Sequence, residues 1–433
     1  MKRTILEDLI SVFKSKVFII LIGLVNVSII ARVLGPSLNG VLASIKVYPE
    51  LFITFGALGI RKSAAFFIGN KSIPENEIYK SILHILGFST SFSVFVSFLL
   101  IYYTMNNRPD LSLVFLALAS IPFSLMNTYL SGIFLGQNKI KEFNQINWLP
   151  NLFTLLGTVI LVYFLKLELV GVLLSQVLAQ LLMSIILVSK LSIKNFLTFR
   201  INYNITFKLL KLGLAYAIAL LLMNLNYRAD VVMMDYLSNS TQIGLYSKGS
   251  VLTQYLWQIP MLLGTIVFAR SASAEDRYQF SLKVCQLLRL SFTVVSIMGL
   301  FLALFAPLII PILFGKEFSD SRYVVYYILP GVVLLTIFKV LNMDISGRGN
   351  PLFVLKSMLP ALAINLVLNY FFIPAYGAIG ASISSTLSYT IGAVLYVYQY
   401  SKFTSLTLKQ ILIFNKADFE LIASILKRYK LYR

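Results

Sequence analysis

The stretch KVFIILIGLVNVSIIARVL, from Lys16 to Leu34, decides the fold class, because it is almost wholly apolar over the length at which a helix crosses a bilayer. A helix needs about 20 such residues to span roughly 30 Å of hydrocarbon. Runs of this kind recur along the chain, of which 58% is hydrophobic and only 12% is charged. Soluble domains carry about 25% charged residues, and the mean hydropathy here is +0.82. The composition therefore excludes an ordinary soluble enzyme and predicts an all-α integral membrane protein.

We predict twelve transmembrane helices from the apolar runs and the polar residues between them. The first run is long enough to stay in the membrane and has no small-residue cleavage site, so we expect no cleaved signal peptide. The predicted helices fall at residues 16–34, 38–60, 78–105, 111–136, 144–165, 169–188, 212–237, 242–269, 289–314, 322–346, 352–373 and 378–400.

Weak internal similarity predicts two six-helix lobes of parallel repeat. At an offset of about 210 residues, LGQNK (Leu135–Lys139) matches SGRGN (Ser346–Asn350). At nearly the same offset, LVGVLLSQ (Leu169–Gln176) matches AIGASISS (Ala378–Ser385). Transporters built from repeats bind their substrates between the repeats. We therefore predict an N-terminal lobe at 1–200, a C-terminal lobe at 201–405 and a basic cytoplasmic tail at 406–433.

The distribution of basic residues predicts the orientation. The net charge is +20, from 37 Lys and Arg against 17 Asp and Glu. Of the 37, 28 lie in loops and helix ends on the side of the N-terminus, five lie on the other side and four lie within helices. Cytoplasmic loops of membrane proteins are rich in Lys and Arg, so both termini are predicted to be cytoplasmic. The same rule explains the positive charge without a nucleic-acid partner.

The sequence carries no motif for covalent or metal-dependent chemistry. It has no G-x-x-x-x-G-K-[ST] phosphate loop, no H-E-x-x-H and no cysteine cluster. The lone cysteine, Cys285, cannot form an intramolecular disulfide. The lone histidine, His84, is predicted to lie buried in a structural role, with proton relay as the alternative. We expect no cofactor and no metal ion.

Charged residues within the predicted helices are the candidate functional residues, because each costs about 2.5–3.5 kcal/mol near the bilayer centre. Lys46 and Glu50 are four residues apart, so they share a helix face and are expected to pair. Arg228 and Asp230 are two apart and point in nearly opposite directions. One of them is therefore expected to face a cavity and the other a lobe interior. There are eight such charges: Lys46, Glu50, Arg228, Asp230, Asp235, Lys248, Lys339 and Asp344.

These charges predict a hydrated, positively charged cavity. The substrate-cavity candidates are Arg32, Lys46, Arg228 and Lys248, which would suit an anionic head group such as a pyrophosphate. The alternative is internal pairing within each lobe. The ion-coupling candidates are Glu50, Asp230 and Asp235. Lys339 and Asp344 lie toward the cytoplasmic end of their helix and are expected only to snorkel.

The C-terminal segment has apolar residues at helical spacing, followed by basic ones. Phe419, Ile422, Leu426 and Tyr429 form the apolar stripe. We predict that the segment from Asn415 to Arg433 is an amphipathic helix on the anionic inner leaflet.

Four stretches together resemble a known family. They are ARVLGPSLNGVLAS (Ala31–Ser44), YRADVVMMDYLSNSTQIGLYSKGSVLTQYLWQIP (Tyr227–Pro260), LPGVVLLTIFKVLNMDISGRGNP (Leu329–Pro351) and INLVLNYFFIPAYGAIGASISSTLSY (Ile364–Tyr389). In order and spacing they are similar to the polysaccharide-transport branch of the multidrug/oligosaccharidyl-lipid/polysaccharide exporter superfamily, to which O-antigen flippases of the Wzx type belong. The resemblance runs from about Lys16 to Lys402. Position by position, it reaches the Arg-x-Asp of Arg228 and Asp230, and Lys248.

The resemblance implies a V of two six-helix lobes in the bacterial cytoplasmic membrane. It implies a flippase that moves undecaprenyl-pyrophosphate-linked oligosaccharide from the inner to the outer leaflet, coupled to ions and preferably to protons. The resemblance also implies contact with membrane lipids. A polysaccharide polymerase and chain-length proteins are the protein partners that it suggests. The alternatives are a multidrug or cation exporter of the same superfamily, the murein-branch lipid II flippase, which normally has fourteen spans, and a membrane polysaccharide polymerase or ligase.

Overall fold

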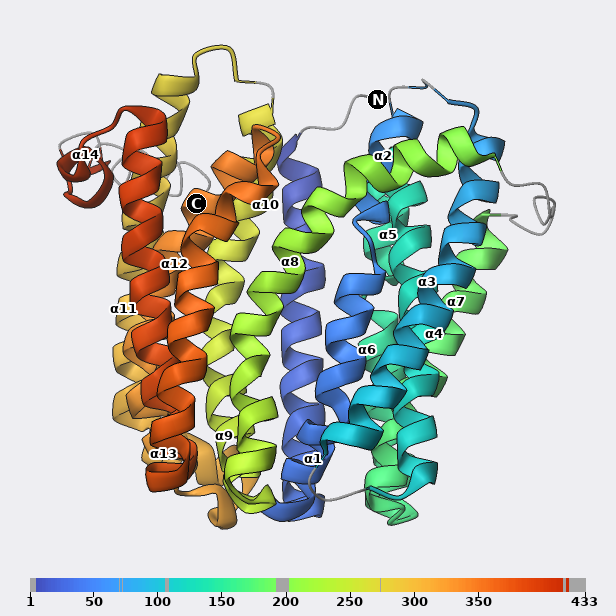
Figure 1. Ribbon diagram of the computed structural model, residues 1–433, viewed down its shortest axis with the longest axis vertical. Helices are drawn as coiled ribbons and strands as arrows, with labels where there is room; N and C mark the ends of the chain where they lie inside the picture. Colours follow the sequence, from blue (N-terminus) through green and yellow to red (C-terminus); the bar gives the residue numbers. More distant parts are fainter. Residues whose placement is uncertain are drawn as a thin grey trace, which may run out of the picture. The chain divides into compact units, whose positions relative to one another are not determined.

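The computed structural model describes residues 5–69, 71, 73–105, 109–191, 202–272, 274–415 and 418–419, which are helical with short connections (Figure 1). Within this part of the chain there is no β-strand, so the all-α prediction is confirmed. The longer helices are α1 (Ile5–Gly56), α2 (Ile60–Gly69), α3 (Glu75–Thr104), α4 (Leu111–Gly136), α7 (Glu168–Leu191), α8 (Tyr203–Leu237), α9 (Ser240–Gln254), α10 (Gln258–Ala272), α11 (Arg277–Phe314), α12 (Ser321–Gly347) and α13 (Leu355–Thr404).

Shorter elements complete the chain. Asp110 accepts a hydrogen bond from the Ser112 amide and so begins α4 with a side-chain cap. Asn202 does the same for α8 through the amide of Ile205. The short elements are α5 (Ile140–Ile146), α6 (Leu149–Gly157), the π-helix η1 (Thr158–Phe164), the 3₁₀ turns η3 (Tyr255–Trp257), η4 (Lys316–Phe318) and η5 (Pro351–Val354), and α14 (Leu408–Leu412).

Two of the helices are hairpins folded at a glycine. Gly35 in α1 has φ 65° and ψ 178°, and Gly377 in α13 has φ 55° and ψ −126°. Glycine adopts such positive φ angles without the clash that a Cβ would cause. The Asn39 amide donates to the Ile30 carbonyl at 3.4 Å, and the Ser388 hydroxyl donates to the Ala361 carbonyl at 2.8 Å. Each glycine therefore turns the chain back beside itself, and the two arms of α1 can be followed at the blue end of Figure 1.

The described residues contain nine candidate membrane spans by length and composition. Two of these, Val17–Gly69 and Pro351–Thr404, contain the folded hairpins and cross twice, because an unbroken helix of 53 residues would be roughly 80 Å long. The stretch formed by α9 and α10 supplies one more crossing, interrupted by the turn at Tyr255–Trp257. This agrees with about twelve transmembrane helices, and the chain is a multi-pass membrane protein.

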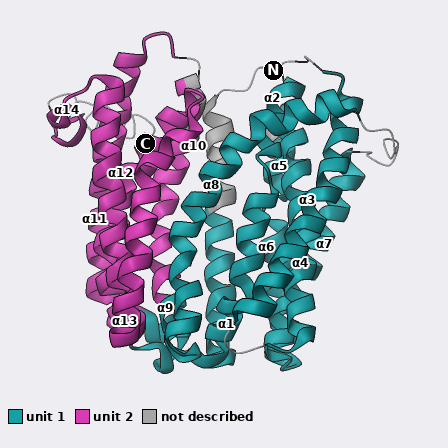
Figure 2. Ribbon diagram, viewed as in Figure 1, with its two compact units in different colours: residues 1–248, 310–320 teal, residues 249–309, 321–433 magenta. Residues whose placement is uncertain are grey.

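The chain divides into two compact units (Figure 2). Unit 1 comprises residues 1–248 with 310–320, and unit 2 comprises residues 249–309 with 321–433. The lobe boundaries at 200 and 405 remain a prediction. So does the amphipathic tail, most of which lies outside the described residues.

Unit 1 is held together by an apolar core and by close backbone contacts between helices. The core combines α2, α3 and α4 around Tyr129, whose hydroxyl donates to the Gly56 carbonyl at 2.7 Å. A Cβ on Gly40 would lie 1.7 Å from the Ser240 carbonyl oxygen, and one on Gly244 would lie 1.9 Å from that of Pro36. Glycine at these positions lets α1 and α9 touch through their backbones.

Unit 2 is centred on α12, which packs against α10 and α13. Among its buried polar residues is Asp344, which is 0% exposed. Arg348 pairs with Asp344 at 2.9 Å, and the Tyr400 hydroxyl donates to it at 2.7 Å. Ser271 donates at 2.5 Å and Ser281 at 3.2 Å. The expectation that Asp344 snorkels is therefore wrong, because it is buried among partners from α10, α11 and α13 and the arginine that follows α12.

Lys339 is also buried. It is 7% exposed, and its ammonium lies 4.0 Å from the ring centroid of Trp257. Trp257 in turn donates from its indole nitrogen to the Val332 carbonyl at 2.9 Å. A desolvated cation on an aromatic face is stabilised by the ring quadrupole. Lys339 therefore belongs to the interior of unit 2, contrary to the snorkelling expected from sequence.

Candidate functional site: a charged cluster and polar cavity in unit 1

A chain of three charges forms the centre of the candidate site. The Lys46 ammonium lies 3.4 Å from the Glu50 carboxylate on α1, so the expected pair four residues apart is present. Arg228 on α8 reaches the other oxygen of Glu50 at 2.6 Å. The side chains are 27%, 33% and 41% exposed for Lys46, Glu50 and Arg228. One carboxylate is thus shared by two cations, which leaves a net positive charge.

Lys248 adds a further positive charge to unit 1, and this charge has less compensation than those of Lys46 and Arg228. It lies on α9 and is only 8% exposed. Among the described residues of unit 1, no carboxylate forms an ion pair with its ammonium. The charge of Lys46 acts on it from nearby, and that interaction is repulsive. Such an arrangement holds excess positive charge ready for an anion.

A polar cavity of about 160 Å³ adjoins the charge chain. Lys46 and Glu50 form part of its wall from α1. Serines of α4, glutamines of α7 and Thr154 of α6 form further parts of its wall. Its twelve lining residues are Lys46, Pro49, Glu50, Ile53, Leu116, Ala117, Ser120, Ser124, Thr154, Leu173, Gln176 and Gln180.

The other candidates from the sequence lie elsewhere in unit 1. Arg32 donates to the carbonyls of Ile312 and Leu313 at the C-terminal end of α11, where a cation is favoured by the helix dipole. Asp230 is 0% exposed and accepts a hydrogen bond from the Tyr246 hydroxyl. Asp235 lies near the C-terminal end of α8 and is partly buried. The structure therefore joins Lys46, Glu50 and Arg228 but not Arg32 or Asp230, whose roles remain predictions.

Arg228 and Asp230 differ in burial. Arg228 is partly exposed, whereas Asp230 is enclosed in the helix packing. Sequence reasoning did not find the ion pair between Arg228 and Glu50, since it joins helices far apart in the chain.

Sequence reasoning also missed the uncharged polar residues of the cavity. Ser120, Ser124, Gln176 and Gln180 lie in helices that are mostly apolar. A signal was present, because amides within transmembrane helices mark interior faces in the same way as charges.

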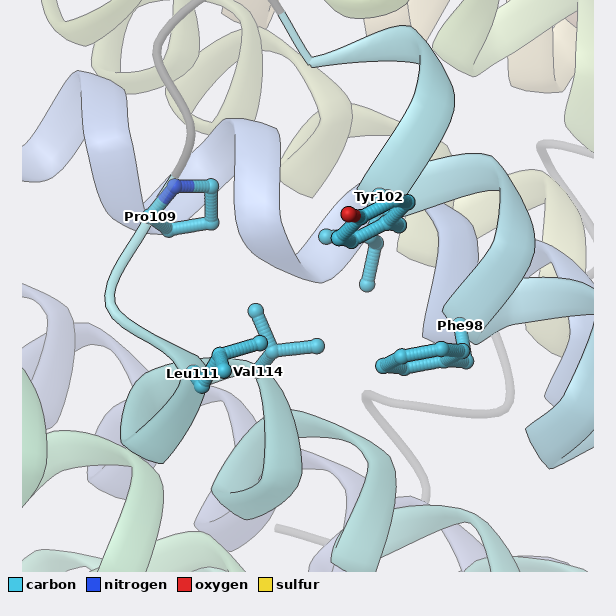
Figure 3. A pocket seen from close by; sticks show the side chains of 6 residues that line it. Phe98, Tyr102, Pro109, Leu111 and Val114 are labelled. Carbon is cyan, nitrogen blue, oxygen red and sulfur yellow. The ribbon is translucent and has the colours of Figure 1, made fainter.

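Two apolar cavities lie at α3 and α4. Figure 3 shows the first, of about 230 Å³, and a second of about 490 Å³ continues along the same helices. Phe98 borders both cavities and stacks on Tyr102 and Phe115 at ring distances of 6.0 and 6.2 Å. The first is lined by Phe98, Ile101, Tyr102, Pro109, Leu111 and Val114. This lining suits hydrocarbon and offers little to a polar head group.

The fold and this site define a multi-pass helical membrane protein with a charged, polar site inside one bundle. The same fold occurs in an inward-facing MATE-family multidrug resistance transporter of the MOP superfamily, at TM-score 0.73 and 14% identity, covering 90% of this chain and 96% of that one. It also occurs in the lipid II flippase MurJ, inward closed, at TM-score 0.72 and 16% identity, covering 96% of both chains. At these identities the likeness concerns the fold alone.

Residues 5–269 match the family described as Polysaccharide biosynthesis protein, and the chain belongs to that family. The probable low-salt glycan biosynthesis flippase Agl15 of Haloferax volcanii is 22% identical over 180 residues, which are 41% of this chain and 38% of that protein. The putative O-antigen transporter of Shigella flexneri is 24% identical over 180 residues, 41% of this chain and 42% of that protein. The matched stretches thus span less than half of these relatives.

Proposed function

We propose that the protein is a flippase for lipid-linked oligosaccharides. It moves undecaprenyl-pyrophosphate-linked O-antigen or other surface polysaccharide units from the inner to the outer leaflet of the bacterial cytoplasmic membrane by alternating access, with both termini cytoplasmic. The observation that carries the proposal is the shared Glu50 flanked by Lys46 and Arg228, with Lys248 nearby, inside an apolar bundle. The family and the names of the two relatives support it.

The physical problem of such a transporter is the sugar head group. Each hydroxyl would lose its hydrogen bonds to water in hydrocarbon, at a cost of several kcal/mol. A hydrated groove with excess positive charge removes this cost and neutralises a pyrophosphate. Arg228 suits the task because its guanidinium can hold Glu50 with one edge and offer its remaining N–H groups to an anion.

The leaflet distribution of the substrate tests this function. In cells without the gene, the lipid-linked oligosaccharide is expected to accumulate on the inner leaflet, out of reach of an impermeant external probe. The wild-type gene should restore access. Arg228→Ala should restore it about tenfold more slowly, the equivalent of one charge-assisted hydrogen bond. Arg322→Ala, which removes a half-buried arginine at the start of α12 in unit 2, should match wild type. Normal display without the gene contradicts the proposal.

Asp230 is proposed to couple transport to a proton gradient. It is fully buried and hydrogen-bonded to Tyr246, so gaining a proton would remove a buried charge and alter this contact. Asp230→Asn is expected to fold and express but to lose the dependence of transport on the pH gradient. The measurement is transport into vesicles with and without an imposed gradient. Unchanged dependence would exclude Asp230 and leave Glu50 and Asp235 as candidates.

A multidrug or cation exporter is the second candidate, because the fold is shared with MATE-family transporters. The excess of positive charge at Lys46, Arg228 and Lys248 disfavours a cationic ligand. Drug susceptibility of the deletion strain separates the two, since a flippase leaves it unaltered unless the envelope is damaged. A membrane polymerase or ligase is less favoured, because the predicted external loops are short. Partnership with a polymerase and with chain-length proteins belongs to the flippase proposal.

A further inference from the structure

The polar cavity of unit 1 contains hydrogen-bonding groups that the protein itself does not use. The Gln176 amide forms no hydrogen bond with any described residue, and neither does the Ser124 hydroxyl. Both line the cavity. Both side chains are half-buried, so their polar groups are open to water or to a polar ligand in the cavity.

Gln180 is oriented by its neighbours. The Asn127 side chain donates to the Gln180 side-chain oxygen at 2.7 Å, and the Ser184 hydroxyl donates to the Asn127 oxygen at 2.9 Å. This relay fixes the Gln180 oxygen as an acceptor, so the NH₂ group is the part left for the cavity. The cavity thus offers NH₂ donors from Gln180 and Gln176 and an acceptor oxygen from Gln176.

The rest of the wall is apolar on one side and charged on another. Ile53, Leu116 and Leu173 supply the apolar surface, and the Lys46–Glu50 pair the charged edge. A volume of about 160 Å³ is close to that of an engineered cavity that binds benzene, a six-membered ring. A sugar ring combines hydroxyls at its rim with C–H faces, and so needs both kinds of wall.

We infer that this cavity is a subsite for one uncharged sugar ring of the transported head group, with Gln176, Gln180 and Ser124 as its specificity-determining residues. The inference rests on the proposed function and deepens it. It separates two tasks: Lys248 and Arg228 meet the anionic linkage, and the glutamines and serine on α7 and α4 contact sugar hydroxyls. With this division, related flippases would differ in sugar specificity through these uncharged residues, while the charged residues that meet the linkage stay the same.

Transport by reconstituted full-length protein tests the inference. Gln176→Leu is expected to lower transport of the native lipid-linked oligosaccharide about tenfold, since it removes an amide worth roughly one to two hydrogen bonds. Binding of undecaprenyl pyrophosphate without sugar should stay as in wild type. Leu178→Ala, on the same helix but 42% exposed, is the control and should transport normally. Equal transport by Gln176→Leu and wild type would overturn the subsite while leaving the flippase intact.

A second readout does not need transport. The lone natural cysteine, Cys285, is fully buried, so Ser124→Cys introduces one accessible thiol. Methyl glycosides of hexoses and N-acetylhexosamines should slow its reaction with a small uncharged thiol reagent, whereas equimolar inorganic phosphate should not. Protection by phosphate alone, or by neither, would mean an anion site or a water-filled cavity and would overturn the inference. If wild type binds glycosides but does not flip lipid, the proposed function fails and the sugar site stands.

Discussion

Replacing Lys248 with methionine is expected to make the protein more stable and nearly inactive. Lys248 is 8% exposed, and no carboxylate of the described part of unit 1 pairs with it. A charge within the bilayer costs up to about 2.5–3.5 kcal/mol, and the neighbouring charge of Lys46 adds repulsion. Methionine has a similar length and no charge, so the free energy of unfolding should rise by up to that amount.

The same substitution should lower the transport rate while it raises the stability. A charge-assisted hydrogen bond to a phosphate contributes about 1.5–3 kcal/mol, so Lys248→Met should slow transport by about ten- to a hundredfold. Thermal unfolding in detergent and the leaflet assay measure the two effects. Lys402→Met removes an exposed lysine near the end of α13 and should alter neither. A less stable Lys248→Met protein would mean that the lysine is structural and that its charge is compensated.

Replacing Arg289 with methionine is expected to cause the largest loss of stability. Arg289 on α11 pairs with Asp418 through two hydrogen bonds of 2.9 and 2.7 Å, and the side chains are 2% and 0% exposed. It also donates to the carbonyls of Gln410 and Ile411 at 2.6 and 3.2 Å. Removing one member of a buried ion pair costs about 3–5 kcal/mol, because the other charge is left unpaired.

A double variant shows how much of this stability loss comes from the unpaired charge of Asp418. Arg289→Met with Asp418→Leu leaves no unpaired charge, and apolar replacement of a buried pair is often close to neutral. The carbonyls of Gln410 and Ile411 then lack a donor and the Asn415 amide lacks its acceptor, so the expected loss falls to about 1–3 kcal/mol. Unfolding midpoints of the two single variants and the double variant measure the coupling. A double variant no more stable than Arg289→Met would show that the arginine acts through the carbonyls and not through Asp418.

The helices were predictable because their cause is local. An apolar run of about 20 residues must bury its backbone hydrogen bonds in a helix once it is in lipid. The turn between two such runs needs only a residue that tolerates positive φ, such as Gly35 or Gly377. The pairing of Lys46 with Glu50 was predictable for the same reason, since it depends on helix periodicity alone.

The fates of the other charges depend on helices that meet only after folding. Asp344 was expected to snorkel, yet its partners are Ser271 on α10, Ser281 on α11, Tyr400 on α13 and Arg348 just after α12. Arg228 shares Glu50 with Lys46, although the two acidic candidates closest to it in sequence are Asp230 and Asp235. Arg32 caps α11, about 280 residues further along the chain.

By itself, the sequence determined the class of protein, the number and order of its membrane crossings and the charges that must be explained. Each of these follows from the free energy of placing single residues or short runs in hydrocarbon. Only the tertiary structure decided which charges neutralise one another, which remain uncompensated and where Gln176 and Gln180 meet Ser124 around a cavity. Those outcomes depend on distances of a few ångströms between helices, and helical spacing along one segment contains no information about its neighbours.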